Sequence, residues 1–136
     1  LRSTDLQAFL GLRQMRKAEW VAQRRFENHL RYAQNLNGCV EFQNWRDHKP
    51  VSISFGALAN NTEHRQEIVE RLVENKVETR IFSAGNLGLH PFWTQRYGKF
   101  DDEMSNKIHS RGFFVPNYPE LTNEDIDFIC QVIKGE

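Results

Sequence analysis

The sequence predicts an α+β domain in which a small, mainly antiparallel sheet is covered by helices and preceded by one long helix. Three observations lead to this fold class. Apolar residues recur at helical spacing in the first part of the chain, short segments of alternating polarity follow between turn residues, and the chain ends on a capped apolar face. Of the 136 residues, 39% are hydrophobic, so the chain can bury one core and we expect a single domain over residues 1–136.

The first predicted element is a helix over residues 4–37. Thr4 and Gln7 have the spacing of a capping box, and apolar residues at helical spacing continue without a breaker to Gly38, which can take the left-handed conformation that ends a helix. At about 1.5 Å per residue this helix would be about 45 Å long, whereas a domain of this size is roughly 37 Å across. The helix is therefore expected to extend beyond the α+β body.

Apolar side chains gather at the end of the helix that extends beyond the body, namely Phe9, Leu10 and Leu12. Because such exposed patches mark interaction surfaces, we expect them to contact a second subunit or a further domain. The chain begins at Leu1 inside a helix-opening segment rather than at a Met or a targeting segment. We therefore expect this sequence to be the C-terminal part of something larger.

The α+β body is expected over residues 39–136, and alternating polarity predicts its strands. Segments 39–45 and 51–55 are expected to pair as a hairpin. A third strand is expected over 77–82, and a short one over 113–115.

A helix is predicted from Thr62, as its cap, to about residue 76. Its apolar face comprises Ile68, Val69, Leu72 and Val73. Residues 83–102 are expected to be irregular, followed by a helical turn near 105–110.

The last helix opens with Thr122 and Asp125, which have capping-box spacing after the rigid corner of residues 116–119. Its apolar face comprises Ile126, Ile129, Cys130 and Ile133.

Composition excludes several classes of function. Eighteen basic and eighteen acidic residues balance, so no global field favours nucleic acid. The sequence has neither a secretory segment nor a membrane-spanning apolar run, so we expect a cytoplasmic protein without a membrane partner. Cys39 and Cys130 lie in apolar stretches and are expected to be buried, reduced thiols. The histidines show no ligand spacing, so we infer no metal site.

The segment over residues 78–91 is the candidate site. Arg80 offers a planar fork of donors on a strand, and Gly85 lets the backbone approach a ligand, so an anion or a sugar could bind there with Asn86 and His90. Each residue also has a simpler interpretation. A strand arginine often forms a surface ion pair, a Gly-Asn pair is often only a turn, and a histidine before proline often satisfies local hydrogen bonds.

Motifs for complete catalytic sites are missing from the sequence. It contains no nucleophile elbow, phosphate loop or dinucleotide fingerprint, and we assign no catalytic residue. Six lysines occur in polar or exposed contexts, and none resembles a buried lysine that would form a Schiff base. The residues predict part of a site.

Three segments match motifs in the correct order. Residues 4–15 read T-D-L-Q-A-F-L-G-L-R-Q-M, residues 79–91 read T-R-I-F-S-A-G-N-L-G-L-H-P, and residues 118–127 read Y-P-E-L-T-N-E-D-I-D. They resemble the patterns T-D-x-Q-A-x-x-G-x-x-Q-L, T-R-x-x-x-A-G-N-L-x-x-x-P and Y-P-x-L-T of the pyridoxal-phosphate-dependent sugar aminotransferases and dehydratases of the DegT/DnrJ/EryC1/StrS type. The nucleotide-hexulose 3-dehydrase branch fits best.

This resemblance implies the C-terminal small domain of fold type I of the pyridoxal-phosphate-dependent transferases. In the family, a large N-terminal domain holds pyridoxal phosphate or pyridoxamine phosphate, and this sequence starts with Leu1-Arg2, just after the Asn that reaches the cofactor of the neighbouring subunit. The family commonly has an Asn at the position just before this start, so the resemblance implies no cofactor-binding residue here, a homodimeric parent and a nucleotide-linked hexose as substrate. Arg80, Asn86 and His90 are the implied substrate-binding residues.

Two functions follow as alternatives. The first is the C-terminal part of an enzyme for deoxysugar or lipopolysaccharide biosynthesis that is inactive by itself. The second is a self-standing binding or regulatory module that keeps the fold without catalysis. The sequence does not distinguish amino transfer from dehydration in the parent enzyme.

Overall fold

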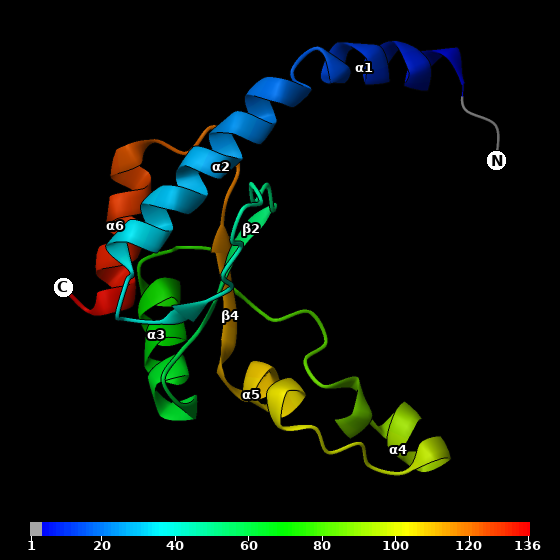
Figure 1. The fold of residues 1–136 in the computed structure, drawn as a ribbon, viewed down its shortest axis with the longest axis vertical. Coiled ribbons are helices and arrows are strands. Elements are labelled where there is room, and N and C mark those ends of the chain that lie inside the picture. The colour runs from blue at the N-terminus through cyan, green and yellow to red at the C-terminus, as the bar shows by residue number, and fades with distance from the viewer. Residues whose placement is uncertain (1–3) are drawn as a thin grey trace.

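A computed structural model describes residues 4–136 as a crescent-shaped molecule with one α+β body (Figure 1). Leu1, Arg2 and Ser3, which precede the first family motif, lie outside the described residues. The elements in chain order are α1 (Asp5–Met15), α2 (Ala18–Asn35), β1 (Glu41–Phe42), β2 (Ser54–Leu58), α3 (Thr62–Glu74), β3 (Arg80–Ile81), the 3₁₀ turn η1 (Leu87–Leu89), α4 (Pro91–Tyr97), α5 (Glu103–Arg111), β4 (Gly112–Pro116) and α6 (Asn123–Lys134).

The sheet has four strands in the order β1-β2-β4-β3, and all neighbouring pairs are antiparallel, as predicted. The predicted hairpin between the first two strands is confirmed, but β1 is only two residues long and β2 starts three residues later than expected, at Ser54. The strand expected over 77–82 is likewise reduced to β3. The outer strands are short because each pairs along one edge only.

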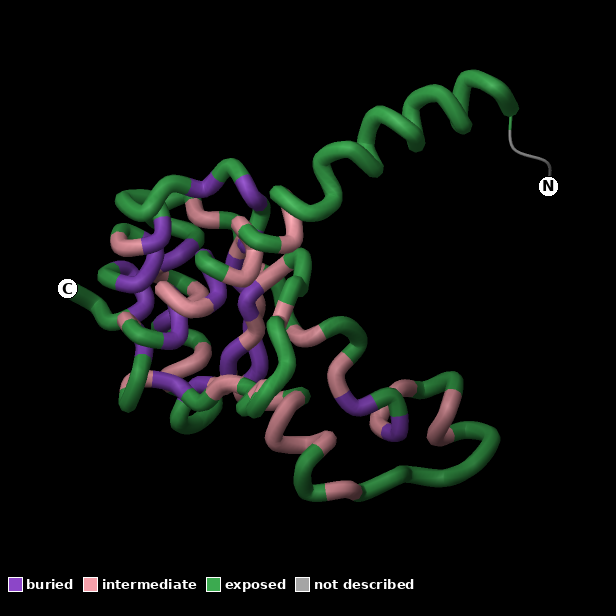
Figure 2. The backbone as a smooth tube through the Cα atoms, turned by 45° about the horizontal axis from the view of Figure 1, so that its top comes forward, coloured by how far each residue is buried: buried purple, intermediate pink, exposed green. Residues whose placement is uncertain are grey.

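Helices α2, α3 and α6 cover one face of the sheet (Figure 1). Alternate residues of β2 and β4 point into this core, which Figure 2 shows as the region where buried backbone concentrates. The fully buried side chains include Tyr32, Leu36, Phe55, Ile68, Leu72, Phe113, Val115, Ile126 and Ile133. At the roughly 1.5–3 kcal/mol gained by burying one large apolar side chain, this cluster is the main source of the fold's stability.

The predicted helix over 4–37 is in fact two helices. The capping box is confirmed, since Thr4 Oγ1 accepts the Gln7 amide and Gln7 Oε1 accepts the Thr4 amide. At the junction the Lys17 amide donates to the carbonyl of Gln14, three residues back, at 2.9 Å, and this tight turn ends α1. Every residue of α1 is exposed (Figure 2), so no packing holds its axis in line with α2.

Three further expectations are corrected. The cap of α3 is Asn61, whose Oδ1 accepts the His64 amide at 2.7 Å, and Thr62 is the first residue of the helix. Val73 was expected on the apolar face of α3 but is 62% exposed. The stretch expected to be irregular holds η1 and α4, because Pro91 at the first helical position is pre-set for a helix.

The capping box of Thr122 and Asp125 is confirmed, and the whole predicted apolar face of α6 is buried. Both cysteines are free. Cys130 is buried as expected, and burial raises the pKa of its thiol to about 11, whereas Cys39 is only half-buried. Within residues 4–136, no helix is both long and apolar enough to cross a membrane.

Gly112 provides a test of the packing between α5 and the sheet. A Cβ on this residue would lie 2.5 Å from the Ile108 carbonyl oxygen and 2.6 Å from Cδ2 of Phe82. We expect Gly112→Ala to lower the free energy of unfolding by about 1–3 kcal/mol, because the backbone oxygen cannot move aside. Urea denaturation measures the change. Gly11→Ala is the matched control, since nothing lies within 4 Å of its Cβ, and equal loss in both variants would contradict this packing.

Candidate functional site

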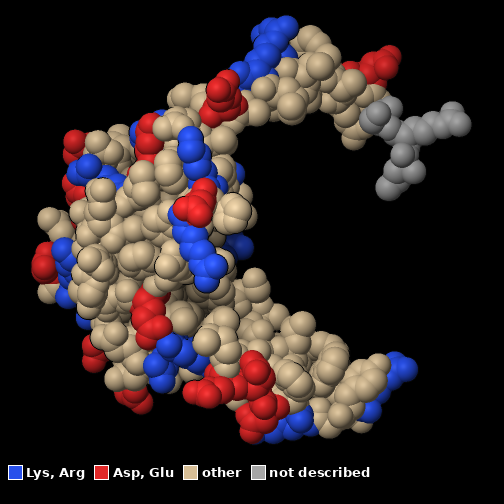
Figure 3. Space-filling model, viewed as in Figure 1, with Lys and Arg blue, Asp and Glu red and all other residues tan. Residues whose placement is uncertain are grey.

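The face of the sheet opposite the helices carries a groove of about 760 Å³. Its lining comes from the start of β2, from the segment around β3, and from β4 with the corner that follows it. Among its lining residues are Ile53, Glu78, Arg80, Phe114, Asn117 and Tyr118. The molecule is hollowed between the two ends of its crescent, α1 and the segment with α4, and the uncovered side of the sheet lies toward this hollow (Figure 3).

Strand register selects the side chains of the groove. Gly56 is opposite Phe114, and Phe114 is opposite Arg80, so these residues share the face that points away from the core. The ring of Phe82 stacks on Phe114 with centroids 4.1 Å apart. A Cβ at Gly56 would lie 2.7 Å from Cζ of Phe82, so glycine is needed there for the two rings to stack over the sheet.

Arg80 lies in the groove with a side chain that is 78% exposed. Its Nη2 and Nε donate to one carboxylate oxygen of Glu78, at 2.9 and 3.2 Å. An exposed pair of this kind contributes only about 0–1 kcal/mol, so an anionic ligand can compete for the guanidinium. Arg80 thus combines the two interpretations that the sequence allowed: it forms a surface ion pair and it faces a groove.

Asn86 is buried and does not line the groove. Its Oδ1 accepts the Gly88 amide at 2.8 Å, and its Nδ2 donates to Asn106 Oδ1 at 2.8 Å and to the Phe100 carbonyl at 3.3 Å. Its own backbone amide donates to Nδ1 of His109 at 3.2 Å. These hydrogen bonds hold the 83–102 segment against α5, and a direct contact of Asn86 with substrate would require them to be exchanged.

His90 and Gly85 also serve the loop. Nε2 of His90 lies 2.7 Å from the Ala84 carbonyl, and His90 is the residue before α4. Gly85 has φ +62°, and its Cβ position is 2.1 Å from Nδ1 of His109, so the group that approaches this glycine is a side chain of α5. Neither residue lines the groove. Of the three sequence-predicted site residues, only Arg80 does.

The structure adds two groove residues that the sequence analysis treated only as part of a rigid corner. Tyr118 is 49% exposed, and Asn117 is fully buried with its Nδ2 donating to the Ser52 carbonyl at 2.9 Å. The sequence did indicate that the strand ends here, since Pro116 and Pro119 flank these two residues and lack amide donors. Nothing in this pattern indicated that the corner would lie beside Arg80.

None of the six lysines lies in a setting suited to a Schiff base with an aldehyde cofactor. All six lie at exposed or half-buried positions, and Lys107, the most enclosed by its surroundings, donates to Glu41 at 2.6 Å. A Schiff-base lysine needs a desolvated or charge-activated setting. Over residues 4–136, no cluster of three His, Cys, Asp or Glu side chains could hold a metal ion. The groove has the chemistry of a binding wall for an anionic ligand with apolar parts.

Comparison with known proteins gives relatives that are considerably longer. The chain is 31% identical to the lipopolysaccharide biosynthesis protein RfbH of Salmonella typhimurium, over 95% of the chain and 31% of that protein. It is 27% identical to the GDP-perosamine synthase of Escherichia coli O157:H7, over 98% of the chain and 36% of that protein. The chain thus spans about a third of the length of these relatives.

A solved structure shares the fold. The GDP-4-keto-6-deoxy-D-mannose-3-dehydratase of E. coli, determined with bound hydrated pyridoxal phosphate, superimposes with a TM-score of 0.84 at 17% identity, over 98% of this chain and 36% of that one. The fold predicted from the three motifs is therefore confirmed. Residues 1–134 match the DegT/DnrJ/EryC1/StrS aminotransferase family, and the chain belongs to that family.

Proposed function

We propose that this chain is the C-terminal part of a pyridoxal- or pyridoxamine-phosphate-dependent enzyme that modifies a nucleotide-linked hexose. The observation that carries the proposal is the exposed guanidinium of Arg80 in a groove on the uncovered face of the sheet, within the second family motif. Family membership and the names of the relatives support the substrate class. The proposal includes both amino transfer and dehydration, because the family is named for aminotransferases and the E. coli structure that shares the fold is a 3-dehydratase.

In this proposal Arg80 binds the diphosphate of the substrate, since a guanidinium matches phosphate geometry with paired donors. The apolar walls, Phe114 and Ile53, and the ring of Tyr118 would pack against the sugar or the base. Asn86 and His90 would act indirectly, by holding the 83–102 segment next to the groove. The chain contributes binding and orientation, and a cofactor-binding domain of the parent enzyme contributes the chemistry.

Three parts of the proposal concern the whole protein. The cofactor is held outside this chain, because its lysines do not offer a Schiff-base site. The parent enzyme is a homodimer. In it, α1 packs against the second subunit or against the cofactor-binding domain. The enzyme works in the cytoplasm, where free thiols such as Cys39 and Cys130 stay reduced.

Arg80→Ala tests the substrate site in the parent enzyme. Loss of a charge-assisted hydrogen bond costs about 1.5–3 kcal/mol, so affinity for the nucleotide-linked sugar should fall about 10- to 150-fold with cofactor occupancy unchanged. Isothermal titration calorimetry measures affinity, and the cofactor absorbance measures occupancy. Arg96→Ala is the matched control, because Arg96 is exposed on α4 and outside the groove. Unchanged affinity with a lowered melting temperature would make Arg80 a structural residue.

Cofactor labelling tests whether the chain alone can hold the aldehyde. We expect no specific aldimine after incubation of the 136-residue chain with pyridoxal phosphate, borohydride reduction and peptide mapping, because every lysine is exposed or half-buried. The denatured chain sets the background for exposed lysines. Stoichiometric labelling of a single lysine in the folded chain would refute the proposal that the cofactor is held elsewhere.

Phe9→Glu tests the role of α1 in association. Leu6, Phe9, Leu10 and Leu12 are all more than half exposed, so the chain should self-associate through this helix, and a charge at Phe9 should shift it to monomer. Size-exclusion chromatography with light scattering gives the mass. Gln14→Glu adds the same charge at an exposed polar position of α1 and should leave the mass unchanged. A monomeric wild-type chain at high concentration would rule out association through α1.

A further inference from the structure

The rim of the groove is formed by residues 116–121, which we call the rim segment and which turn at Pro119 and Glu120. It contains Pro116, Pro119 and the groove residues Asn117 and Tyr118. Ladder pairing with β2 ends at Pro116, opposite Ser54. Beyond that point the backbone carbonyls of the rim segment need donors from outside the sheet, because buried or half-buried carbonyls without partners are costly. Within the segment itself, the Leu121 amide donates to the Tyr118 carbonyl at 3.3 Å.

One stripe of α2 supplies these donors. The side chains of Arg24, Asn28 and Tyr32 stand four residues apart, so they lie along the same side of α2. The Tyr32 hydroxyl donates to the Pro116 carbonyl at 2.9 Å, Asn28 Nδ2 to the Tyr118 carbonyl at 3.0 Å, and Arg24 Nε and Nη2 to the Pro119 and Leu121 carbonyls at 3.3 and 2.9 Å. Burial raises the pKa of the Tyr32 hydroxyl, which keeps it a donor.

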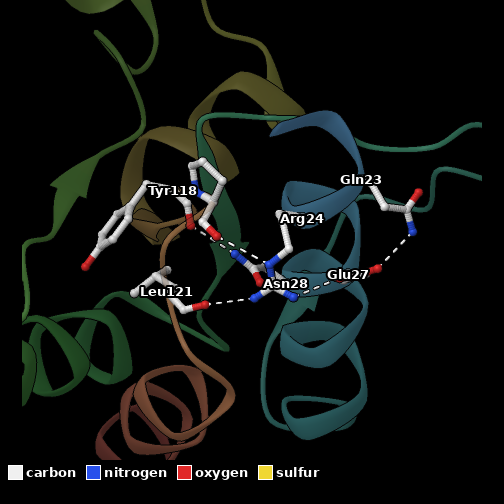
Figure 4. Close-up of polar contacts among 7 residues, drawn as sticks. Gln23, Arg24, Glu27, Asn28, Tyr118 and Leu121 are labelled. Carbon is white, nitrogen blue, oxygen red and sulfur yellow. Dashed lines mark hydrogen bonds and ion pairs between the residues drawn. The ribbon is translucent and has the colours of Figure 1, made fainter. Parts of the chain in front are cut away.

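The guanidinium of Arg24 is itself oriented. Its Nη1 donates to Glu27 at 2.8 Å, and Glu27 in turn accepts a hydrogen bond from Gln23 at 2.9 Å (Figure 4). The hydrogen bond from Gln23, with that from Arg24, lowers the pKa of the Glu27 carboxyl, so this acceptor stays charged at neutral pH. Arg24 is thus fixed in the geometry that lets it donate to two carbonyls of the rim segment.

The hydrogen bonds from Tyr32, Asn28 and Arg24 to the rim segment all end on backbone carbonyls, and none of them involves the Tyr118 side chain. Figure 4 shows the Tyr118 ring pointing away from α2, while its carbonyl faces Asn28. The ring lines the groove together with Arg80, which comes from β3. We infer that Arg24 and Asn28 are positioning residues, which set the Tyr118 ring relative to Arg80 across the groove; the inference rests on the proposed substrate site.

A fluorine label tests this inference without a known substrate. The chain has three tyrosines, Tyr32, Tyr97 and Tyr118, so 3-fluorotyrosine gives three ¹⁹F signals, which single Tyr→Phe variants assign. We expect Asn28→Ala to shift or broaden the Tyr118 signal and to leave the Tyr97 signal unchanged. Asn35→Ala is the matched control on the same helix, because its Nδ2 donates to Asp127 of α6 at 2.7 Å, away from the rim segment.

Affinity for GDP and dTDP is the second readout. Loss of one hydrogen bond that orients the rim should weaken these probes about 3- to 10-fold in Asn28→Ala, while Asn35→Ala stays within about twofold of wild type. Both variants should melt a few degrees lower, so a purely structural role predicts no difference between them. If Asn28→Ala does not fold, Arg24→Lys replaces it, since lysine keeps the charge but lacks the planar fork whose Nε and Nη2 reach the two carbonyls.

An unchanged Tyr118 signal in Asn28→Ala, or an equal change in Asn35→Ala, would overturn the inference. If neither nucleotide binds the wild-type chain while the Tyr118 signal responds only to the rim variants, the positioning role stands and the proposed substrate site is the part that fails. The two proposals are therefore decided by separate measurements.

Discussion

The antiparallel ladder between β2 and β4 is the constraint on which both the core and the groove depend. Its five residue pairs place Phe55 and Val115 against the helices, and Gly56 and Phe114 on the opposite face. Because side chains alternate along a strand, a shift of one residue would exchange the two faces. The same hydrogen bonds therefore specify a buried apolar cluster and an open groove, and neither can change without the other.

Arg80 and Asn86 belong to the same family motif, but the structure places them in different environments that the sequence does not reveal. Arg80 lies on the open face of the sheet with an exposed guanidinium, whereas Asn86 is buried and satisfies the loop and α5. A buried amide with all its donors and acceptors engaged stabilises a loop, and an exposed cation beside a weak partner is available to a ligand. In the proposed function, the motif therefore supplies one binding residue, Arg80, and one buried residue, Asn86, that keeps the neighbouring segment in place.

Much of the remaining surface belongs to elements outside the core. The α1 helix and the 83–102 segment form the two ends of the crescent (Figure 1), and both carry large exposed apolar side chains, among them Phe9, Leu10, Phe92 and Tyr97. The relatives are about three times as long as this chain, and a groove with one cation and no activated lysine is a partial site. These features agree with a chain that binds substrate alongside surfaces supplied by other parts of a protein.

Local chemistry is what the sequence determined by itself. The capping boxes at Thr4 and Thr122 each join residues three positions apart, and the apolar residues of α6 recur at spacings of one to three positions; all of these were predicted correctly. Tertiary structure alone decided the shortness of β1 and β3 and the place of Tyr118 beside Arg80. The physical reason is that these depend on donors and packing surfaces far along the chain, as when Asn28 holds the carbonyl of a residue 90 positions away.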